Sequence, residues 1–130
     1  MYDKYLITGA TGFLGRTVVE ELVDHDAQVR TLVLHNDPYI NLLPKEVHII
    51  VGDVCDKNSL ADFFADADSR TCVIHCAGIV SVASRPSPKL YQVNVGGTWR
   101  ILRQCLAHEV GRLIHVSSVH AIPERPEGCV

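Results

Sequence analysis

The chain has 130 residues, 47% of them hydrophobic, and a formal net charge of −3. This length predicts one domain over residues 1–130, and an acidic chain without a basic run excludes nucleic acid as an expected main partner. No apolar run is long enough to span a membrane, and no charged leader precedes the first motif, so neither an anchor nor export is expected. Without such a leader, the protein is expected in the cytoplasm. The five scattered cysteines favour reduced thiols, and the histidine spacing predicts no metal site.

The first expected element is a strand over residues 4–8 that runs directly into three glycines spaced Gly-x-x-Gly-x-x-Gly. The first glycine allows a tight turn, the second lets a diphosphate approach the backbone, and the third lets the next helix pack closely. Free N–H groups and the positive end of that helix then face an anion. This context favours a dinucleotide site over an ordinary glycine-rich turn, and the residues assigned to it are Thr8, Gly9, Thr11, Gly12, Phe13, Leu14 and Gly15.

Further strands are expected over residues 29–34, 47–51, 71–76 and 112–117, alternating with helical patterns. Ser87 and Pro88 predict the start of a helix that runs to about residue 107, in which Gly96 and Gly97 indicate close packing on the sheet and Trp99 is expected to pack. The alternation predicts an α/β fold, a Rossmann-type doubly wound parallel sheet with strand order 3-2-1-4-5. A Pro/Gly-rich segment over 123–130 follows. The fifth strand would leave an apolar edge, so a homo-oligomer is expected.

In such a sheet a ligand binds at the carboxyl ends of the strands, where the strand order reverses. The short polar segments that follow the strands meet at that edge. Read without any family, the alternative is that Asp53 is a turn residue, Asn94 a polar helix residue, and Ser117 and Ser118 the end of a strand, and their position at this edge favours the site over that alternative. The cofactor-binding candidates at this edge, beyond the first loop, are His35, Asn36, Asp53, Val54, Ala77, Gly78 and Ser117.

The motifs over residues 8–15, 52–54, 75–78, 94–98 and 116–118 together resemble the extended short-chain dehydrogenase/reductases, the NAD-dependent epimerase/dehydratase family. Within it they are most similar to the branch of dihydroflavonol reductases and 3β-hydroxysteroid dehydrogenases. The resemblance implies an oxidoreductase that transfers a hydride between a nicotinamide cofactor and a hydroxyl or carbonyl of a small organic substrate. A nucleotide-sugar epimerase or dehydratase, or a non-catalytic dinucleotide-binding sensor or assembly module, is the alternative.

The same resemblance implies roles for individual residues. The Asp53 carboxylate would accept a hydrogen bond from the adenine amino group beside Val54, and Ala77 and Gly78 would border the ribose and diphosphate. Two residues are catalytic candidates by the same resemblance. Asn94 would brace the active-site backbone, and Ser118 would hydrogen-bond the reacting oxygen.

Two departures from the family pattern limit this interpretation. The family's proton-transferring Tyr-x-x-x-Lys pair has no match, because no lysine stands four residues after any tyrosine. The pair is expected past residue 130 together with the substrate-binding part, so this chain is expected to be inactive alone. At the end of the second strand, Val33 and Leu34 are neither acidic for NAD nor basic for NADP, which leaves His35 or Asn36 as substitutes. The expected cofactor is NAD or NADP, with a lean to NAD.

Overall fold

The computed structural model describes residues 1–81, 85 and 87–122, and its elements follow the expected order. The strands are β1 (Lys4–Thr8), β2 (Gln28–Val33), β3 (His48–Val51), β4 (Thr71–His75) and β5 (Arg112–His115). The helical segments are α1 (Phe13–Asp24), η1 (Ile40–Leu42), α2 (Lys57–Phe63), α3 (Pro88–Tyr91), η2 (Gln92–Gly97), α4 (Thr98–Ala107) and η3 (Val119–Ala121). The Pro/Gly-rich segment 123–130 lies outside the described residues.

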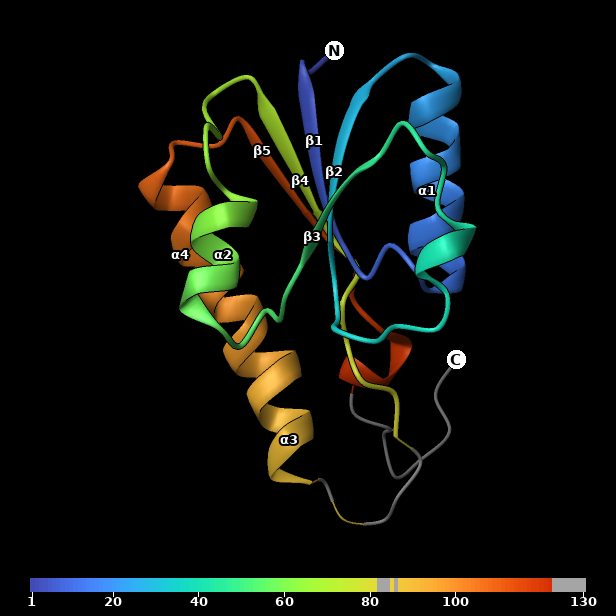
Figure 1. The fold of residues 1–130 in the computed structure, drawn as a ribbon. Helices are drawn as coiled ribbons and strands as arrows, with labels where there is room; N and C mark the ends of the chain where they lie inside the picture. Colours follow the sequence, from blue (N-terminus) through green and yellow to red (C-terminus); the bar gives the residue numbers. More distant parts are fainter. Residues whose placement is uncertain (82–84, 86, 123–130) are drawn as a thin grey trace, which may run out of the picture.

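All strand pairs of the sheet are parallel, and the order β3-β2-β1-β4-β5 confirms the predicted doubly wound topology. Helix α1 covers one face and helices α2 and α4 cover the other (Figure 1). Thr8, the last residue of β1, lies in register with Leu32 on one side and His75 on the other. The central strands therefore end together, and the loops that follow them lie side by side at the carboxyl ends of the strands.

Alternation along the strands divides the core into two clusters. Leu6 and Val73 face α2 and α4, where they pack with Phe63, Phe64 and Ile101. The next residues along the same strands face the other side, and this cluster contains Ile7, Val19, Val29, Cys72 and Ile74. Cys72 is 1% exposed, as expected for a cysteine that serves as a small hydrophobic residue.

The helix predicted from Ser87 to residue 107 is present, but its middle is a π-helical turn, η2. A π turn holds more residues than an α turn, which rotates the helix faces that follow it. The glycine prediction is accordingly wrong in its detail. Gly97 packs against the Val54 side chain in the loop after β3 rather than on the sheet, and Gly96 faces the Arg100 guanidinium. Trp99 is 59% exposed, so the expectation that it packs is wrong.

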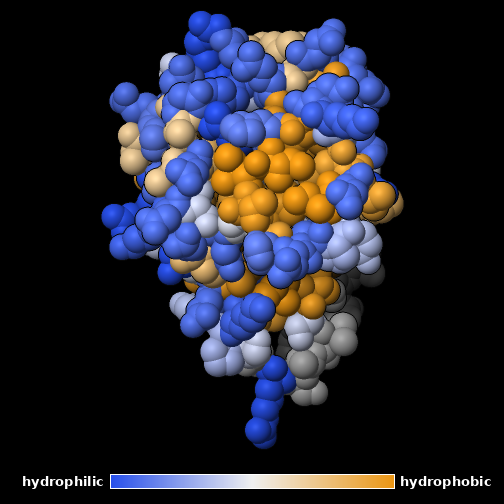
Figure 2. Space-filling model, in the orientation of Figure 1, coloured by the Kyte–Doolittle hydropathy of each residue, from blue (hydrophilic) through white to orange (hydrophobic). Residues whose placement is uncertain are grey.

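The two edges of the sheet are β3 and β5. Figure 2 shows an apolar patch over β3, framed by polar residues, and Val51 of that strand is 51% exposed. At the other edge, β5 pairs only with β4 among the described strands, and its Ile114 is 43% exposed. Among the described residues, no helix has both the length and the apolar character needed to cross a membrane.

Candidate functional site

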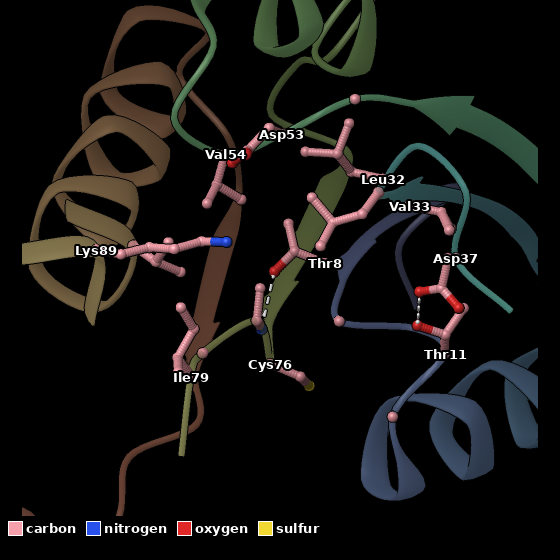
Figure 3. Close-up of a pocket in the computed structure, with 17 residues that line it drawn as sticks. Thr8, Thr11, Leu32, Val33, Asp37, Asp53, Val54, Cys76, Ile79 and Lys89 are labelled. Atoms are coloured by element: carbon pink, nitrogen blue, oxygen red, sulfur yellow. Dashed lines mark hydrogen bonds between the residues drawn. The ribbon is translucent and has the colours of Figure 1, made fainter. Parts of the chain in front are cut away.

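A cavity of about 440 Å³ lies at the carboxyl ends of the central strands, where the sequence predicts that a ligand binds (Figure 3). It brings together many of the residues that the sequence predicts for the site. These are Thr8, Gly9, Thr11, Gly12, Asp53, Val54, Ala77 and Gly78. The predicted residues that do not line it are Phe13, Leu14, Gly15, His35, Asn36, Asn94, Ser117 and Ser118.

The three glycines of the first loop meet three different requirements. Gly9 has a φ of +71°, and a Cβ there would lie 2.7 Å from the Ala77 nitrogen. A Cβ on Gly15 would overlap the Gly9 carbonyl oxygen, so only glycine lets α1 lie this close to β1. At Gly12 the nearest neighbour would be that same oxygen at 3.4 Å, an ordinary contact. Gly12 is therefore the glycine that the fold itself does not need, and it lines the cavity.

Phe13 and Leu14 begin α1 directly after Gly12. The two residues are 87% and 48% exposed, and neither is among those that line the cavity. Their N–H groups belong to the first turn of the helix, where the backbone donors have no partner inside the helix. What these two residues can offer a ligand is the backbone rather than the side chain.

Asp37, in the turn after β2, lines the cavity, although it is not among the site residues predicted from the sequence. Its Oδ2 accepts a hydrogen bond from Thr11 Oγ1 at 2.8 Å, and its Oδ1 accepts one from the Tyr39 N–H at 2.8 Å. The two predicted substitutes lie elsewhere. His35 borders a shallower depression beside Ser59, and Asn36 has a φ of 60° and lines neither hollow. The turn brings the acidic group back to the glycine loop.

Asp53 has the turn role that was its alternative interpretation, and it lines the cavity as well. Its Oδ1 accepts a hydrogen bond from the Cys55 N–H at 2.8 Å. Burial, together with the Asp53 charge, raises the pKa of the Cys55 thiol, and burial raises the pKa of Cys76, which also lines the cavity. Both thiols are therefore protonated near neutral pH and are poor nucleophiles.

Asn94, in the π turn, holds the chain segment that follows β4. Its Oδ1 accepts from the Ile79 N–H at 2.7 Å, and its Nδ2 donates to the Ile79 carbonyl at 2.9 Å. One side chain thus satisfies both backbone groups of Ile79, as a neighbouring strand would. Ala77, Gly78 and Ile79 line the cavity, so Asn94 shapes the wall without forming part of it.

His75 links this wall to the glycine loop, a role that the sequence reasoning missed. It is 1% exposed, its Nδ1 lies 2.6 Å from Thr8 Oγ1, and its Nε2 lies 2.9 Å from Thr98 Oγ1. Thr98 Oγ1 donates its proton to the Asn94 carbonyl at 2.7 Å, so it accepts from the imidazole Nε2–H. Thr8 Oγ1 accepts from the Ala77 N–H at 3.2 Å and donates to Nδ1.

These directions fit a neutral imidazole with its proton on Nε2. Burial, and secondarily the charge of His115 stacked on it at 5.5 Å between ring centroids, lowers the pKa of His75 to about 4. The ring is therefore a fixed neutral connector at physiological pH.

Ser117 and Ser118 follow β5 and are both exposed. The Ser118 carbonyl accepts a hydrogen bond from the Ala121 N–H at 3.0 Å at the start of η3.

Two lining residues come from the helical segment on the side of the cavity opposite the glycine loop. They are Lys89 of α3 and Val93 of η2. Neither was predicted, because a helix pattern does not show which of its turns approaches the sheet edge.

Comparisons with known proteins agree with this geometry. The sequence matches the 3-beta hydroxysteroid dehydrogenase/isomerase family over residues 6–128. It is 34% identical to human 3 beta-hydroxysteroid dehydrogenase type 7 over 131 aligned residues, which cover 95% of this chain and 35% of that protein. The chain thus spans about a third of the length of such relatives.

Solved structures give the same result. A short-chain dehydrogenase/reductase superfamily protein of Agrobacterium tumefaciens with bound NAD is 29% identical, with a TM-score of 0.72 over 88% of this chain and 32% of that one. UDP-glucose 4-epimerase of Thermus thermophilus in complex with NAD is also 29% identical, with a TM-score of 0.74 over 85% of this chain and 36% of that one. The chain belongs to the 3-beta hydroxysteroid dehydrogenase/isomerase family, within the superfamily that its motifs resemble.

Proposed function

We propose that this chain is the cofactor-binding part of an oxidoreductase, and that it binds NAD in preference to NADP. The observation that carries the proposal is the pairing of two features in one cavity. Gly12 lines the cavity with backbone that carries no side chain, and the Asp37 carboxylate also lines it, held by Thr11 of the same loop. The first suits a diphosphate and the second suits a ribose diol, which are neighbouring groups of an adenine dinucleotide.

The preference for NAD is argued from the charge of Asp37. A carboxylate accepts hydrogen bonds from the two ribose hydroxyls of NAD, whereas the 2′-phosphate of NADP is an anion that it repels. Asp37 comes four residues after the end of β2, so it reaches the cavity by the turn rather than along the strand. Asp37 would thus supply the carboxylate that is missing at the end of β2, where the last residue is Val33.

The proposed reaction of the whole protein is hydride transfer to or from a hydroxyl or carbonyl carbon of a small organic substrate. The bound nicotinamide supplies the hydride chemistry, and the protein supplies binding and orientation. Asn94 would serve by holding Ile79, and Ser118 would hydrogen-bond the reacting oxygen. Two alternatives remain: a sugar-nucleotide epimerase, as one similar structure is named, and a non-catalytic dinucleotide-binding module.

The proposal also keeps two predictions about context. A cytoplasmic location is supported by the cysteines of the described residues, Cys55, Cys72, Cys76 and Cys105, all of which are free thiols. A homo-oligomer is supported by the partly exposed apolar edge at β5.

The test is a comparison of NAD and NADP on the Asp37→Asn variant. The unaltered chain should bind NAD more tightly than NADP. Asp37→Asn should weaken NAD about ten-fold and narrow the difference between the two cofactors, because a charged acceptor is lost and a repulsion is removed. Calorimetric titration measures both dissociation constants.

Asp62→Asn is the matched control, because Asp62 is exposed on α2 and does not line the cavity. That variant should bind both cofactors as the unaltered chain does. An unchanged preference in Asp37→Asn would refute the assigned role of Asp37, and tighter binding of NADP by the unaltered chain would refute the cofactor choice.

A further inference from the structure

The charges that line the cavity are two carboxylates and a single ammonium group. Among the described residues that line it, Asp37 and Asp53 supply the negative charges and Lys89 is the one basic residue. Figure 3 shows the Lys89 side chain reaching into the cavity from the helix side, with its amino group turned toward Thr8 and Val54. A ligand with two negative charges would meet repulsion here unless a cation offset the carboxylates.

The backbone that carries Lys89 is well anchored. Ser87 caps α3 by accepting the Leu90 N–H at 3.2 Å, and Pro88 occupies the first turn. Farther along the same continuous helical segment, Gly97 packs against Val54 beside the cavity. Lys89 is therefore held at the cavity mouth by the cap on one side and by this contact on the other.

Lys89 has no ion-pair partner among the described residues, in contrast to three cations of β1, α1 and β2. Lys4 and Arg30 both pair with Asp66, and Arg16 lies 3.7 Å from Glu20 along α1. Arg16 follows the glycine loop directly but does not line the cavity. The glycine loop itself carries no cationic side chain, so the cation that the described lining offers to an anion at Gly12 is Lys89.

We propose that Lys89 is a ligand of the cofactor diphosphate, binding it from the side opposite the glycine loop. This inference rests on the proposed function, since it needs a dinucleotide in the cavity. Lys89 and Asp37 lie on opposite sides of the cavity in Figure 3, so the ammonium group approaches a ligand from a different side than the carboxylate of Asp37. Lys89 thus strengthens binding of both cofactors without favouring the 2′-phosphate of NADP.

The test uses ligands that differ in charge. Lys89→Met removes the charge and keeps the length of the side chain, and Lys89→Arg keeps the charge. Titrations with ADP-ribose, which carries the diphosphate, and with adenosine, which carries no phosphate, give the dissociation constants by nuclear magnetic resonance. Lys89→Met should lower the affinity for ADP-ribose about ten-fold, as expected for a lost charged hydrogen bond, and should change the affinity for adenosine less than about two-fold.

Three further readings complete the experiment. Lys89→Arg should retain most of the affinity, and the loss in Lys89→Met should shrink as salt is added, because salt screens the contact. Lys57→Met is the matched control, since Lys57 is exposed in the first turn of α2 and does not line the cavity. It should leave both ligands unchanged.

Equal losses for ADP-ribose and adenosine would place Lys89 on the nucleoside and overturn the inference. Unchanged ADP-ribose affinity in Lys89→Met, with normal NAD binding by the unaltered chain, would overturn it while leaving the proposed function intact. Absence of NAD and ADP-ribose binding by the unaltered chain would overturn both.

Discussion

The two sides of the cavity are built in different ways. On the side of the glycine loop, the shape is set by backbone and by missing side chains, at Gly9, Gly12 and Gly15. On the side of the helix that begins at Pro88, the shape is set by side chains, because Asn94 holds Ile79 and His75 joins Thr8 to Thr98. The side formed by backbone is encoded by one short sequence motif, whereas the side formed by side chains needs residues from several elements.

The largest effect should come from the glycine that the fold needs. Gly15→Ala would place a methyl group against the Gly9 carbonyl, and neither backbone can move without shifting α1 from the sheet. We expect the free energy of unfolding to fall by about 3 kcal/mol or more. Chemical denaturation followed by circular dichroism measures it.

Gly12→Ala is the matched substitution, since its methyl group would meet only an ordinary contact at 3.4 Å. Its free energy of unfolding should change by no more than about 0.5 kcal/mol. Equal losses in the two variants would mean that the glycines of this loop do not divide their roles as described.

On the helix side, the strongest test is acid. The folded-state pKa of His75 is lowered from 6.5 to about 4. The stability that comes from keeping this buried ring neutral is therefore fully present above about pH 6.5 and is lost as the pH falls toward 4. We expect the free energy of unfolding to drop by about 3 kcal/mol through that window. His75→Phe should be less stable at pH 7, because the Thr8 and Thr98 hydroxyls each lose one of their hydrogen-bond partners, and should lack this part of the pH dependence. A pH profile that is the same in both proteins would refute the role of His75.

The same contrast explains what the sequence could predict. The fold follows from alternating patterns that repeat along the chain, and the glycine loop follows from local spacing. Asp37 was missed because its contact is with Thr11, 26 residues earlier, across a turn whose path no local pattern describes. Lys89 and His75 were missed for a similar reason. A helix pattern does not show that the turn carrying Lys89 approaches the cavity, and a buried histidine on an apolar strand looks like any other core residue until its partners from β1 and α4 are placed.

We propose that the cavity binds an adenine dinucleotide with its diphosphate at Gly12. Calorimetric titration of NAD into the chain and into Gly12→Val, with both proteins shown to be folded, tests it most directly. The valine side chain would occupy the space in front of the loop and leave the fold unchanged. We therefore predict measurable NAD binding by the unaltered chain and none by the variant. No binding by the unaltered chain at millimolar NAD, or equal affinity in Gly12→Val, would contradict the account.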